Sequence, residues 1–343
     1  MSVLYMNVNL AIVVEKRKAE EVKNLLIEKN LLDVSRKIKR YGDKVEIPVK
    51  GVPSLPCRFD IVEQKEIVGR KIFNPFEEIK KRLRDKIGGE GYRNLPKKWE
   101  KIGDVLILKL DEIEEKEKIA KVYAEVLKCK SVLEDVGGIK GITRKPCFKL
   151  IYGDKTETVH IENGIKYRFD VSKIMFSSGN IDERIRMANV VTKNEIVVDM
   201  FAGIGYFTLP IAVYGKARVY ACEINPLAYE YLKENILLND VLHLVKPILG
   251  DCRKVAPHGV ATRVIMGCLD SMSFIPYALK TLESDGIIHF HQKCKEEDFP
   301  EKIFKEAESI IKADGWKAEM LFCKKIKSYA PRIIHGVIDI KVF

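Results

Sequence analysis

The sequence predicts an α/β protein in which smaller α+β units precede a domain built on a parallel sheet, starting near residue 185. Strand–helix alternation after that residue carries the prediction, because it is typical of a parallel sheet covered by helices on both faces. A turn of small residues and a set of acidic strand ends add to it. The expected strands are the short apolar runs 196–198, 218–221, 245–249, 263–266 and 286–290.

The first 65 residues predict a small α/β unit. Residues 3–14 alternate weakly between apolar and polar side chains, which favours a strand. Residues 16–30 place apolar side chains at helical spacing, and residues 45–49 form a second strand candidate before a segment rich in glycine and proline. Residues 66–94 begin a highly charged stretch with the runs KKRLRDK and PKKWEK. We expect a helix-containing linker there.

Residues 95–184 predict an α+β domain on the substrate side of the protein. A strand is expected at 104–110 and a helix at 112–128. The loop GGIKGITRKP at 137–146 is rich in glycine and basic residues. Further strand candidates are 132–133, 147–152, 156–160 and 167–170, the last two joined by the turn ENG.

Charge and cysteine content restrict the partners and the compartment. The chain has 343 residues, a formal net charge of +11 and a pI near 9.1, which suits a polyanion such as nucleic acid, although a lysine-rich surface without a partner gives the same total. No run of 18 apolar residues suggests a membrane span, and the N-terminus lacks the features of a signal peptide. The eight cysteines show no CxxC spacing, so we expect reduced thiols in a cytoplasmic protein without a zinc or iron–sulfur site. We also expect the protein to be a monomer.

Acidic residues at three successive strand ends indicate the cofactor. The run EIVVDMFAGIGYFTL ends its strand in Asp199, and its turn, Phe201–Gly205, lets backbone approach a ligand, with Phe201 and Gly203 expected in contact. Glu223 follows Gly203 by 20 residues, an offset suited to ribose hydroxyls, and Asp251 ends a third strand near the expected adenine, which Cys252 would contact through its backbone.

This layout favours S-adenosylmethionine and a class I, Rossmann-like transferase domain at 185–343. A dinucleotide dehydrogenase and a ligand-free α/β domain are the alternatives. A dehydrogenase usually carries GxGxxG, whereas the residue three positions after Gly205 is Thr208.

Three segments resemble the archaeal and eukaryotic tRNA position-37 transferases: DMFAGIGYFTLPIA (199–212), ACEINPLAYEYLKENILLN (221–239) and IKSYAPR (326–332). The resemblance covers about residues 144–343. Residues 1–60 are more faintly similar to the small tRNA-elbow domain of the methyltransferases. One branch of the family methylates guanine-37 at N1, and the other transfers the 3-amino-3-carboxypropyl group in wybutosine synthesis.

Two departures from the methyltransferase pattern favour the second branch. The methyltransferases carry Asn-Leu-Pro where this chain has Gly267, Cys268 and Leu269, and the segment MFSSGNIDER (175–184) has the SxGNxxER form of the wybutosine branch. The resemblance therefore implies transfer of the aminocarboxypropyl group to C7 of 4-demethylwyosine in tRNA-Phe, with release of methylthioadenosine. Alternatives are a guanine-37 N1-methyltransferase and a tRNA-binding protein that has lost catalysis.

The same resemblance implies roles near the transferred group. Glu183 aligns with the general base of the methyltransferases, and a salt bridge to a neighbouring arginine is its alternative role. Arg184 is expected near the methionine carboxylate, and Ser177 is expected to hydrogen-bond the cofactor. Gly267 is expected to leave room for another pose of the methionine moiety.

Basic residues in two regions are candidates for contact with the anticodon loop. Arg144 and Lys145, on the glycine-rich loop, would hold a phosphate or the target base, with Arg144 assigned a catalytic role; a plain basic surface is the alternative. A basic tail around Tyr329 would track the stem backbone through Lys324, Lys327 and Arg332. His289 and His291 alternate on an apolar strand; a metal pair is conceivable there, but we expect satisfied histidines and no metal.

Overall fold

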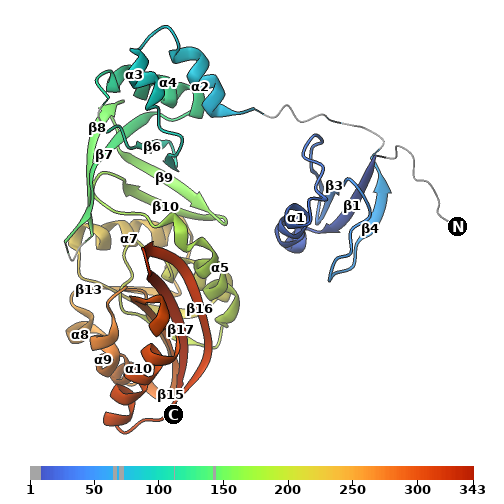
Figure 1. Ribbon diagram of the computed structural model, residues 1–343. Coiled ribbons are helices and arrows are strands. Elements are labelled where there is room, and N and C mark those ends of the chain that lie inside the picture. The colour runs from blue at the N-terminus through green and yellow to red at the C-terminus, as the bar shows by residue number, and fades with distance from the viewer. Residues whose placement is uncertain (1–8, 65–67, 69–72, 112, 142–143) are drawn as a thin grey trace, which may run out of the picture. The chain divides into compact units, whose positions relative to one another are not determined.

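The computed structural model describes residues 9–64, 68, 73–111, 113–141 and 144–343, and it divides into two compact units, residues 1–75 and 76–343 (Figure 1). The first unit is an antiparallel sheet in the order β2-β3-β1-β4 with α1 against it. Its elements are β1 (Leu10–Glu15), the 3-10 helix η1 (Lys16–Lys18), α1 (Ala19–Glu28), β2 (Lys39–Tyr41), β3 (Lys44–Pro48) and β4 (Asp60–Glu63).

Apolar spacing accounts for the core of this unit. Val22 and Leu26 are one helical turn apart on α1, and both pack on Ile12 of β1 and Ile47 of β3. The expected helix and both expected strands are present, although residues 3–8 of the first lie outside the described part of the chain. β2 and β4 were not predicted.

The second unit begins with helices where the sequence predicted a linker. They are α2 (Pro75–Leu83), α3 (Gly89–Arg93) and, further on, α4 (Lys116–Leu127). Ile79 and Leu83 of α2 are fully buried against α4 and β6. The helices expected within the 66–94 linker are therefore present. From residue 75 onward, however, the segment packs into the second unit and does not act as a linker, because Ile79 and Leu83 form an apolar stripe at i, i+4 that the surrounding lysines and arginines obscure.

A four-stranded sheet, in the order β5-β6-β7-β8, supports those helices. Its strands are β5 (Glu100–Ile102), β6 (Val105–Leu108), β7 (Ser131–Lys140) and β8 (Lys145–Tyr152). The glycine-rich loop of the prediction is mostly strand, since Ile139 of β7 pairs with Pro146 of β8. Only a short turn remains, and residues 142 and 143 within it lie outside the described residues.

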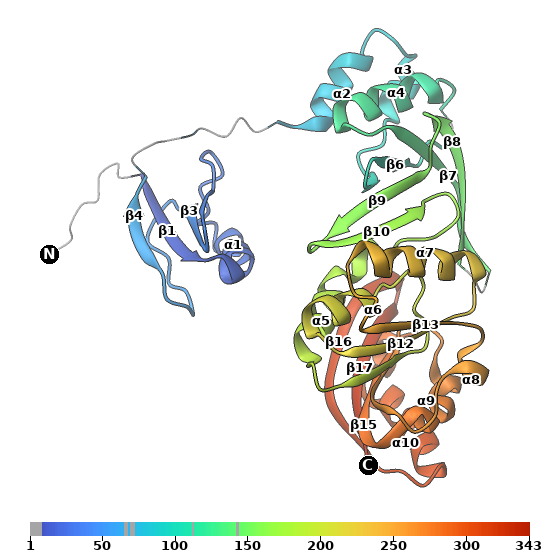
Figure 2. The ribbon, with the colours of Figure 1, turned by 180° about the vertical axis from the view of Figure 1, so that it is seen from behind.

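The hairpin of β9 (Glu157–Glu162) and β10 (Ile165–Asp170) joins this sheet to the rest of the unit (Figures 1 and 2). Side-chain amides of α7 (Pro226–Leu238) and its C-cap hold the edge of β10. Asn235 bonds both backbone groups of Arg168, and Asn239 bonds both backbone groups of Lys166, at 2.6–3.1 Å. One cluster of buried apolar residues contains members from Ile102 to Ile265. Residues 95–184 and 185–343 therefore belong to one compact unit.

The last part of the chain is a seven-stranded sheet in the order β13-β12-β11-β14-β15-β17-β16. β11 to β15 are parallel, as predicted, and β17 runs antiparallel to both neighbours. The strands are β11 (Ile196–Asp199), β12 (Arg218–Glu223), β13 (Val245–Leu249), β14 (Ala261–Met266), β15 (Leu282–Lys295), β16 (Ala318–Ala330) and β17 (Ile333–Val342). The basic tail of the prediction is the tip of the hairpin between β16 and β17.

Helices lie on both faces of this sheet (Figure 2). Besides α7 they are α5 (Ile181–Val190), α6 (Thr208–Pro210) with the π-helix η3 (Ile211–Gly215), α8 (Cys252–Val255), α9 (Ile275–Thr281) and α10 (Glu301–Ala313). The remaining 3-10 turns are η2 (Ser178–Asn180), η4 (Met272–Phe274) and η5 (Glu296–Asp298). Among the described residues, no helix is long and apolar enough to cross a membrane.

Candidate active site

The carboxyl ends of β11, β12 and β14 open onto a cavity of about 480 Å³. This is the edge of an open α/β sheet at which ligands bind. Of the residues predicted for the site, the structure brings seven together around this cavity: Arg144, Ser177, Arg184, Phe201, Glu223, Gly267 and Lys327.

The turn after β11 brings backbone close to the cavity. Gly203 and Gly205 have φ values of 57° and 103°, which side-chain-bearing residues rarely adopt. A Cβ at Gly203 would lie 2.5 Å from the ring of Tyr206, and one at Gly205 would lie 2.6 Å from Leu209. Both glycines are therefore required by the packing of the turn.

Asp199 supports this turn from behind. It is fully buried and does not line the cavity; its carboxylate accepts from the Thr208 hydroxyl at 2.7 Å and from the Phe201 amide at 3.3 Å. Burial raises the pKa of Asp199 to about 6, against the lowering effect of those hydrogen bonds. The sequence predicted that Asp199 contacts the cofactor directly. The structure instead directs its side chain from the end of β11 into the core.

We expect Asp199→Asn to stabilise the protein more at neutral than at acidic pH. The folded state holds a proton on Asp199 up to about pH 6 and the unfolded state only to about pH 4, so this group lowers stability as pH rises between those values. The difference in unfolding free energy, variant minus wild type, should grow by up to about 3 kcal/mol. Urea unfolding at about pH 4 and about pH 7 measures it. A difference that does not change with pH would contradict this account.

Glu223 is the acid that faces the cavity. Its Oε2 accepts from the Gly203 amide and its Oε1 from the Asn225 amide, both at 2.7 Å. Burial raises the pKa of Glu223, while the backbone amides act against that rise. The carboxylate thus ties the glycine turn to the end of β12 and keeps further lone pairs for a ligand, in agreement with its predicted position.

Asp251 and Cys252 lie at the N-terminus of α8 and are not among the lining residues. The Asp251 carboxylate caps α8 through the Arg253 amide at 3.0 Å and also binds the Arg253 guanidinium. Burial raises the pKa of the Cys252 thiol to about 12, so it stays protonated. Arg253 binds the Asp251 carboxylate, and the adenine contact of Asp251 stays a prediction.

Arg184 lines the cavity, but its guanidinium fork is already occupied. Nε and Nη2 bind the two carboxylate oxygens of Glu162, each at 2.6 Å, and Nη1 donates to the Ser177 carbonyl at 3.0 Å. The guanidinium therefore faces β9 and is not available for a bidentate ion pair with a methionine carboxylate. This corrects the prediction that Arg184 binds that carboxylate. The hydroxyl of Ser177 accepts from Lys327 Nζ at 3.0 Å.

Glu183 is fully buried and does not line the cavity. Its Oε1 lies 2.7 Å from Arg186 Nη2 and 2.9 Å from His289 Nε2. Glu183, His289 and His291 offer atoms within 4.8 Å of one another, a spacing of metal ligands, yet Arg186 already binds the carboxylate. The salt bridge, which was the alternative role for Glu183, is the one that the structure shows.

The predicted basic residues divide into two groups. Lys145, Lys324 and Arg332 are exposed to solvent. Lys327 instead projects into the cavity from β16, and Arg144, with a left-handed φ of 52°, reaches it from the turn before β8. Neither Lys327 nor Arg144 has an ion pair among the described residues, so the cavity carries two cations without a direct ion-pair partner there.

The sequence did not single out Asn180, Tyr206 or His335, all of which line the cavity. Three buried polar atoms of the lining have no hydrogen-bond partner in the described part of the chain: Arg144 Nε, Asn180 Oδ1 and His335 Nδ1. A buried polar atom without a partner is unfavourable, so these atoms indicate where a ligand completes the site.

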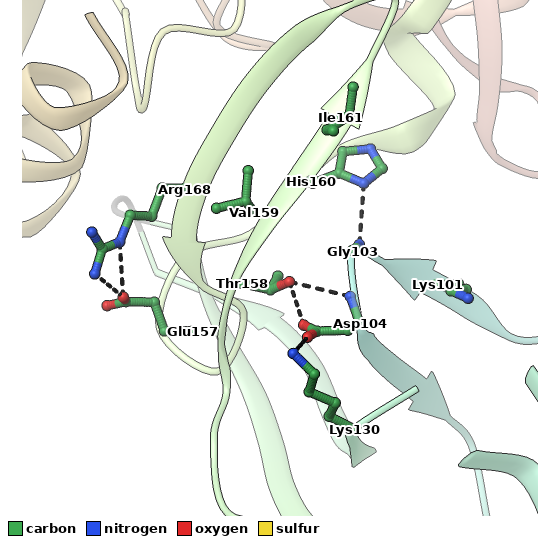
Figure 3. Close-up of a pocket in the computed structure, with 10 residues that line it drawn as sticks. All are labelled: Lys101, Gly103, Asp104, Lys130, Glu157, Thr158, Val159, His160, Ile161 and Arg168. Carbon is green, nitrogen blue, oxygen red and sulfur yellow. Dashed lines mark hydrogen bonds and ion pairs between the residues drawn. The ribbon is translucent and has the colours of Figure 1, made fainter. Parts of the chain in front are cut away.

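Two further cavities of the same unit lie near the strands that carry the site. One of about 270 Å³ shares Arg144, Ser177 and Lys327 with the main cavity and extends it toward β5 and β6. The other, of about 830 Å³, lies between β9 and the loop after β5 (Figure 3). Asp104 pairs with Lys130 and Glu157 with Arg168, while Lys101 donates to the Leu127 carbonyl at 2.7 Å. We therefore interpret this cavity as a structural contact between the two sheets.

Comparison with known proteins gives consistent matches along the chain. The model of the TRM5/TYW2 methyltransferase domain matches residues 158–320, that of the TYW2 N-terminal domain residues 79–156, and that of the tRNA methyltransferase 5 N-terminal domain residues 11–54. The tRNA(Phe) (4-demethylwyosine(37)-C(7)) aminocarboxypropyltransferase of Pyrococcus horikoshii is 47% identical over 77% of this chain and 98% of its own.

Two other relatives are similar over long stretches. The tRNA (guanine(37)-N(1))-methyltransferase Trm5b of Methanocaldococcus jannaschii is 35% identical over 97% of this chain and 98% of its own. The crystal structure of P. horikoshii TYW2 in complex with MeSAdo has a TM-score of 0.71 at 45% identity and covers 78% of this chain and 98% of that one. Together with the parallel sheet, the glycine turn and Glu223, these matches show that the chain belongs to the TRM5/TYW2 methyltransferase family.

Proposed function

We propose that this protein transfers the 3-amino-3-carboxypropyl group of S-adenosylmethionine to C7 of 4-demethylwyosine at position 37 of tRNA-Phe and releases methylthioadenosine. The similarity is greater to the relative named for this transfer, at 47% identity, than to the named guanine-37 methyltransferase, at 35%. The observation that carries the proposal is the packing around Gly267.

Gly267 lies against an aromatic ring at the wall of the cavity. A Cβ at this position would lie 2.9 Å from Cε2 and 3.2 Å from Cδ2 of Phe207. The ring thus occupies the space that the asparagine side chain of the methyltransferase pattern would need. An apolar ring cannot hold a polar group as an amide does, so it supports a different pose of the methionine moiety.

The residues around the cavity fit S-adenosylmethionine. When bound, this cofactor supplies electrophilic carbons next to a sulfonium. The Glu223 carboxylate accepts from ribose hydroxyls, while the backbone at Gly203 allows close approach. Arg144 and Lys327 compensate an anionic group, and Asn180 Oδ1 accepts from an ammonium group. Phe207, which is 5% exposed, excludes water from the reacting centre.

The first unit and the exposed basic residues serve tRNA binding in this proposal. The match of residues 11–54 to the tRNA methyltransferase 5 N-terminal domain supports a contact with the tRNA elbow. The same match favours a second candidate function, N1-methylation of guanosine 37, since the named methyltransferase also spans 97% of this chain. The anticodon loop would reach the cavity past Lys145, Lys324 and Arg332, and the protein would act as a monomer.

Replacing Lys145, Lys324 and Arg332 together by glutamine should weaken tRNA binding and reduce its salt dependence. Each phosphate contact contributes about 0.7 to 0.9 to the slope of log affinity against log salt, so the slope should fall by about 2 to 3. Filter binding over a salt series measures it. As a control, Lys302 and Lys312 on α10, which pair with Asp298 and Glu308, should be replaceable without a change in slope. An unchanged slope in the triple variant would remove these residues from the interface.

Gly267→Ala should lower the rate of transfer by about tenfold or more, because forcing a methyl group into a packed site costs about 1–3 kcal/mol and displaces Phe207. Gly89→Ala is the matched control, since a Cβ there meets nothing within 4 Å and its φ is ordinary. The double variant Gly267→Ala/Phe207→Leu should recover activity. Full activity in the single variant would show that this contact does not shape the site.

The small-molecule product distinguishes the two candidate activities. We would incubate the protein with S-adenosylmethionine and tRNA-Phe carrying 4-demethylwyosine, and separate the nucleosides by chromatography. Methylthioadenosine is expected. S-adenosylhomocysteine would establish methyl transfer, and absence of both products would support a tRNA-binding protein without catalysis.

A further inference from the structure

Three buried histidines form a hydrogen-bonded chain that ends at the cavity. His289 and His291 alternate on β15, and His335 projects from the neighbouring strand β17. His291 Nε2 lies 3.0 Å from His289 Nε2, and His291 Nδ1 lies 2.7 Å from His335 Nε2. All three side chains are at most 1% exposed, and the ring of Phe207 packs on the first two.

Two carboxylates fix the buried end of this chain. His289 Nδ1 bonds Asp339 Oδ1, and His289 Nε2 lies 2.9 Å from Glu183 Oε1. Burial alone would raise the pKa of both carboxyl groups, but hydrogen bonds from His289 and Arg186 hold both pKa values below their usual range. An ionised carboxylate only accepts, so both ring nitrogens of His289 carry hydrogen. Arg186 Nη2 lies beside them, 2.9 Å from His289 Nδ1, and donates to both carboxylates.

The remaining hydrogen positions follow one after another. His289 Nε2 carries hydrogen, so His291 Nε2 must accept. Burial keeps the pKa of His291 well below its usual value and lowers that of His335 to about 4, so each of these rings is neutral and has one hydrogen. The hydrogen of His291 is therefore on Nδ1 and is donated to His335 Nε2. The hydrogen of His335 is consequently on Nδ1.

The open end of the chain is a donor without an acceptor. His335 lines the cavity, and its buried Nδ1 has no partner among the described residues. Lys327 and Arg144 are the cations that act on this ring, and neither is in an ion pair within the described residues. Arg144 Nε also lacks a partner. An N–H group beside two such cations is suited to an anionic oxygen.

We propose that the histidine chain, anchored by Glu183 and Asp339, holds His335 as a hydrogen-bond donor to a carboxylate bound in the cavity. This inference rests on the proposed function, which makes that group the carboxylate of the transferred aminocarboxypropyl moiety. His335 is then a ligand-binding residue. Glu183, His289 and His291 are positioning residues that act through it, and Glu183 influences the reaction without touching the substrate.

The tautomer of His335 tests the chain in the ligand-free protein. We would label the histidines with ¹⁵N and record their ring shifts by NMR, assigning His335 by its loss in His335→Asn. Nδ1 should be of the protonated, pyrrole type. In Glu183→Met, which offers no acceptor to His289 Nε2, the ring should keep only the Nδ1 hydrogen that faces Asp339. His291 must then reverse to avoid two facing lone pairs, which makes His335 Nδ1 the unprotonated nitrogen. Asp339→Asn is the control, because Glu183 still requires hydrogen on His289 Nε2.

An unprotonated Nδ1 in the wild type, or a tautomer that Glu183→Met leaves unchanged, would overturn the proposal. A stoichiometric metal ion in the purified protein would also overturn it, since ligation would replace these hydrogen bonds. None of these outcomes depends on which group the protein transfers. The experiment therefore distinguishes failure of the proposed histidine hydrogen-bond chain from failure of the proposed transfer reaction.

Calorimetry with two matched ligands tests the carboxylate. His335→Leu should bind S-adenosylmethionine about tenfold more weakly, the usual effect of losing a hydrogen bond to a charged group. It should bind decarboxylated S-adenosylmethionine as the wild type does. His335→Asn, whose amide can donate from the position of Nδ1, should retain affinity for both. Equal losses for both ligands would indicate a merely structural role, and a loss of tRNA affinity alone would place the acceptor on the nucleic acid; either result overturns the proposal.

Discussion

Arg184→Leu is expected to lower the free energy of unfolding by about 3–5 kcal/mol, because it leaves a buried carboxylate without its partner. Arg184 is 2% exposed and binds both oxygens of Glu162 at 2.6 Å, with its guanidinium also stacked over the ring of Phe176. Glu162 cannot be hydrated in the variant. Urea unfolding followed by circular dichroism measures the loss.

The same hairpin offers a matched control. Arg168 of β10 binds Glu157 of β9 at 2.6 Å, yet both side chains are about half exposed, at 50% and 43%. Arg168→Leu should therefore cost less than about 1 kcal/mol. The double variant Arg184→Leu/Glu162→Leu should recover much of the stability lost in the single variant, since it removes the unpaired charge. Similar losses for Arg184→Leu and Arg168→Leu would show that burial of the pair does not matter.

Glu223→Ala is expected to weaken binding of S-adenosylmethionine by about a hundredfold. Hydrogen bonds to an ionised group contribute about 1.5–3 kcal/mol each, and in the proposed site Glu223 would accept from the ribose hydroxyls. The variant also loses the bonds that hold the Gly203 and Asn225 amides. Glu223→Gln keeps one acceptor oxygen and should show an intermediate loss. Isothermal titration calorimetry gives all three affinities.

Asp251 provides the contrast for this prediction. Sequence analysis placed Asp251 and Glu223 together in the cofactor site, but Arg253 occupies the Asp251 carboxylate, and only Glu223 lines the cavity. Asp251→Asn should change the affinity by less than about threefold, because its amide oxygen still caps α8. A larger effect for Asp251→Asn than for Glu223→Gln would reverse the assignment of these two acids.

Strand positions were predictable because apolar runs and glycine turns are local signals. All five parallel strands of the large sheet lie where the runs predicted them. β16 and β17 were missed, since the lysines of β16 mask its alternation and the sheet exposes that edge strand. The burial of α2 in the second unit was missed for a related reason, because only Ile79 and Leu83 mark its buried stripe.

Site residues were predictable when their role depends on the backbone and much less so when it depends on partners distant in sequence. Phe201 of the glycine turn, Glu223 and Gly267 line the cavity, as expected. Arg184 binds Glu162 from another hairpin, and Glu183 binds a histidine 106 positions later, so neither partner is visible in a local motif. Lys327 was assigned to a tRNA-binding tail, yet the register of β16 turns it into the cavity.

Labelled S-adenosylmethionine tests the central claim most directly. The protein would be incubated with tRNA-Phe carrying 4-demethylwyosine and with cofactor labelled either in the carboxyl carbon or in the methyl group, and label in the tRNA would be counted. Because the aminocarboxypropyl group carries the carboxyl carbon, carboxyl label should enter the tRNA while methyl label stays in the released methylthioadenosine. Methyl label in the tRNA, without carboxyl label, would contradict the account.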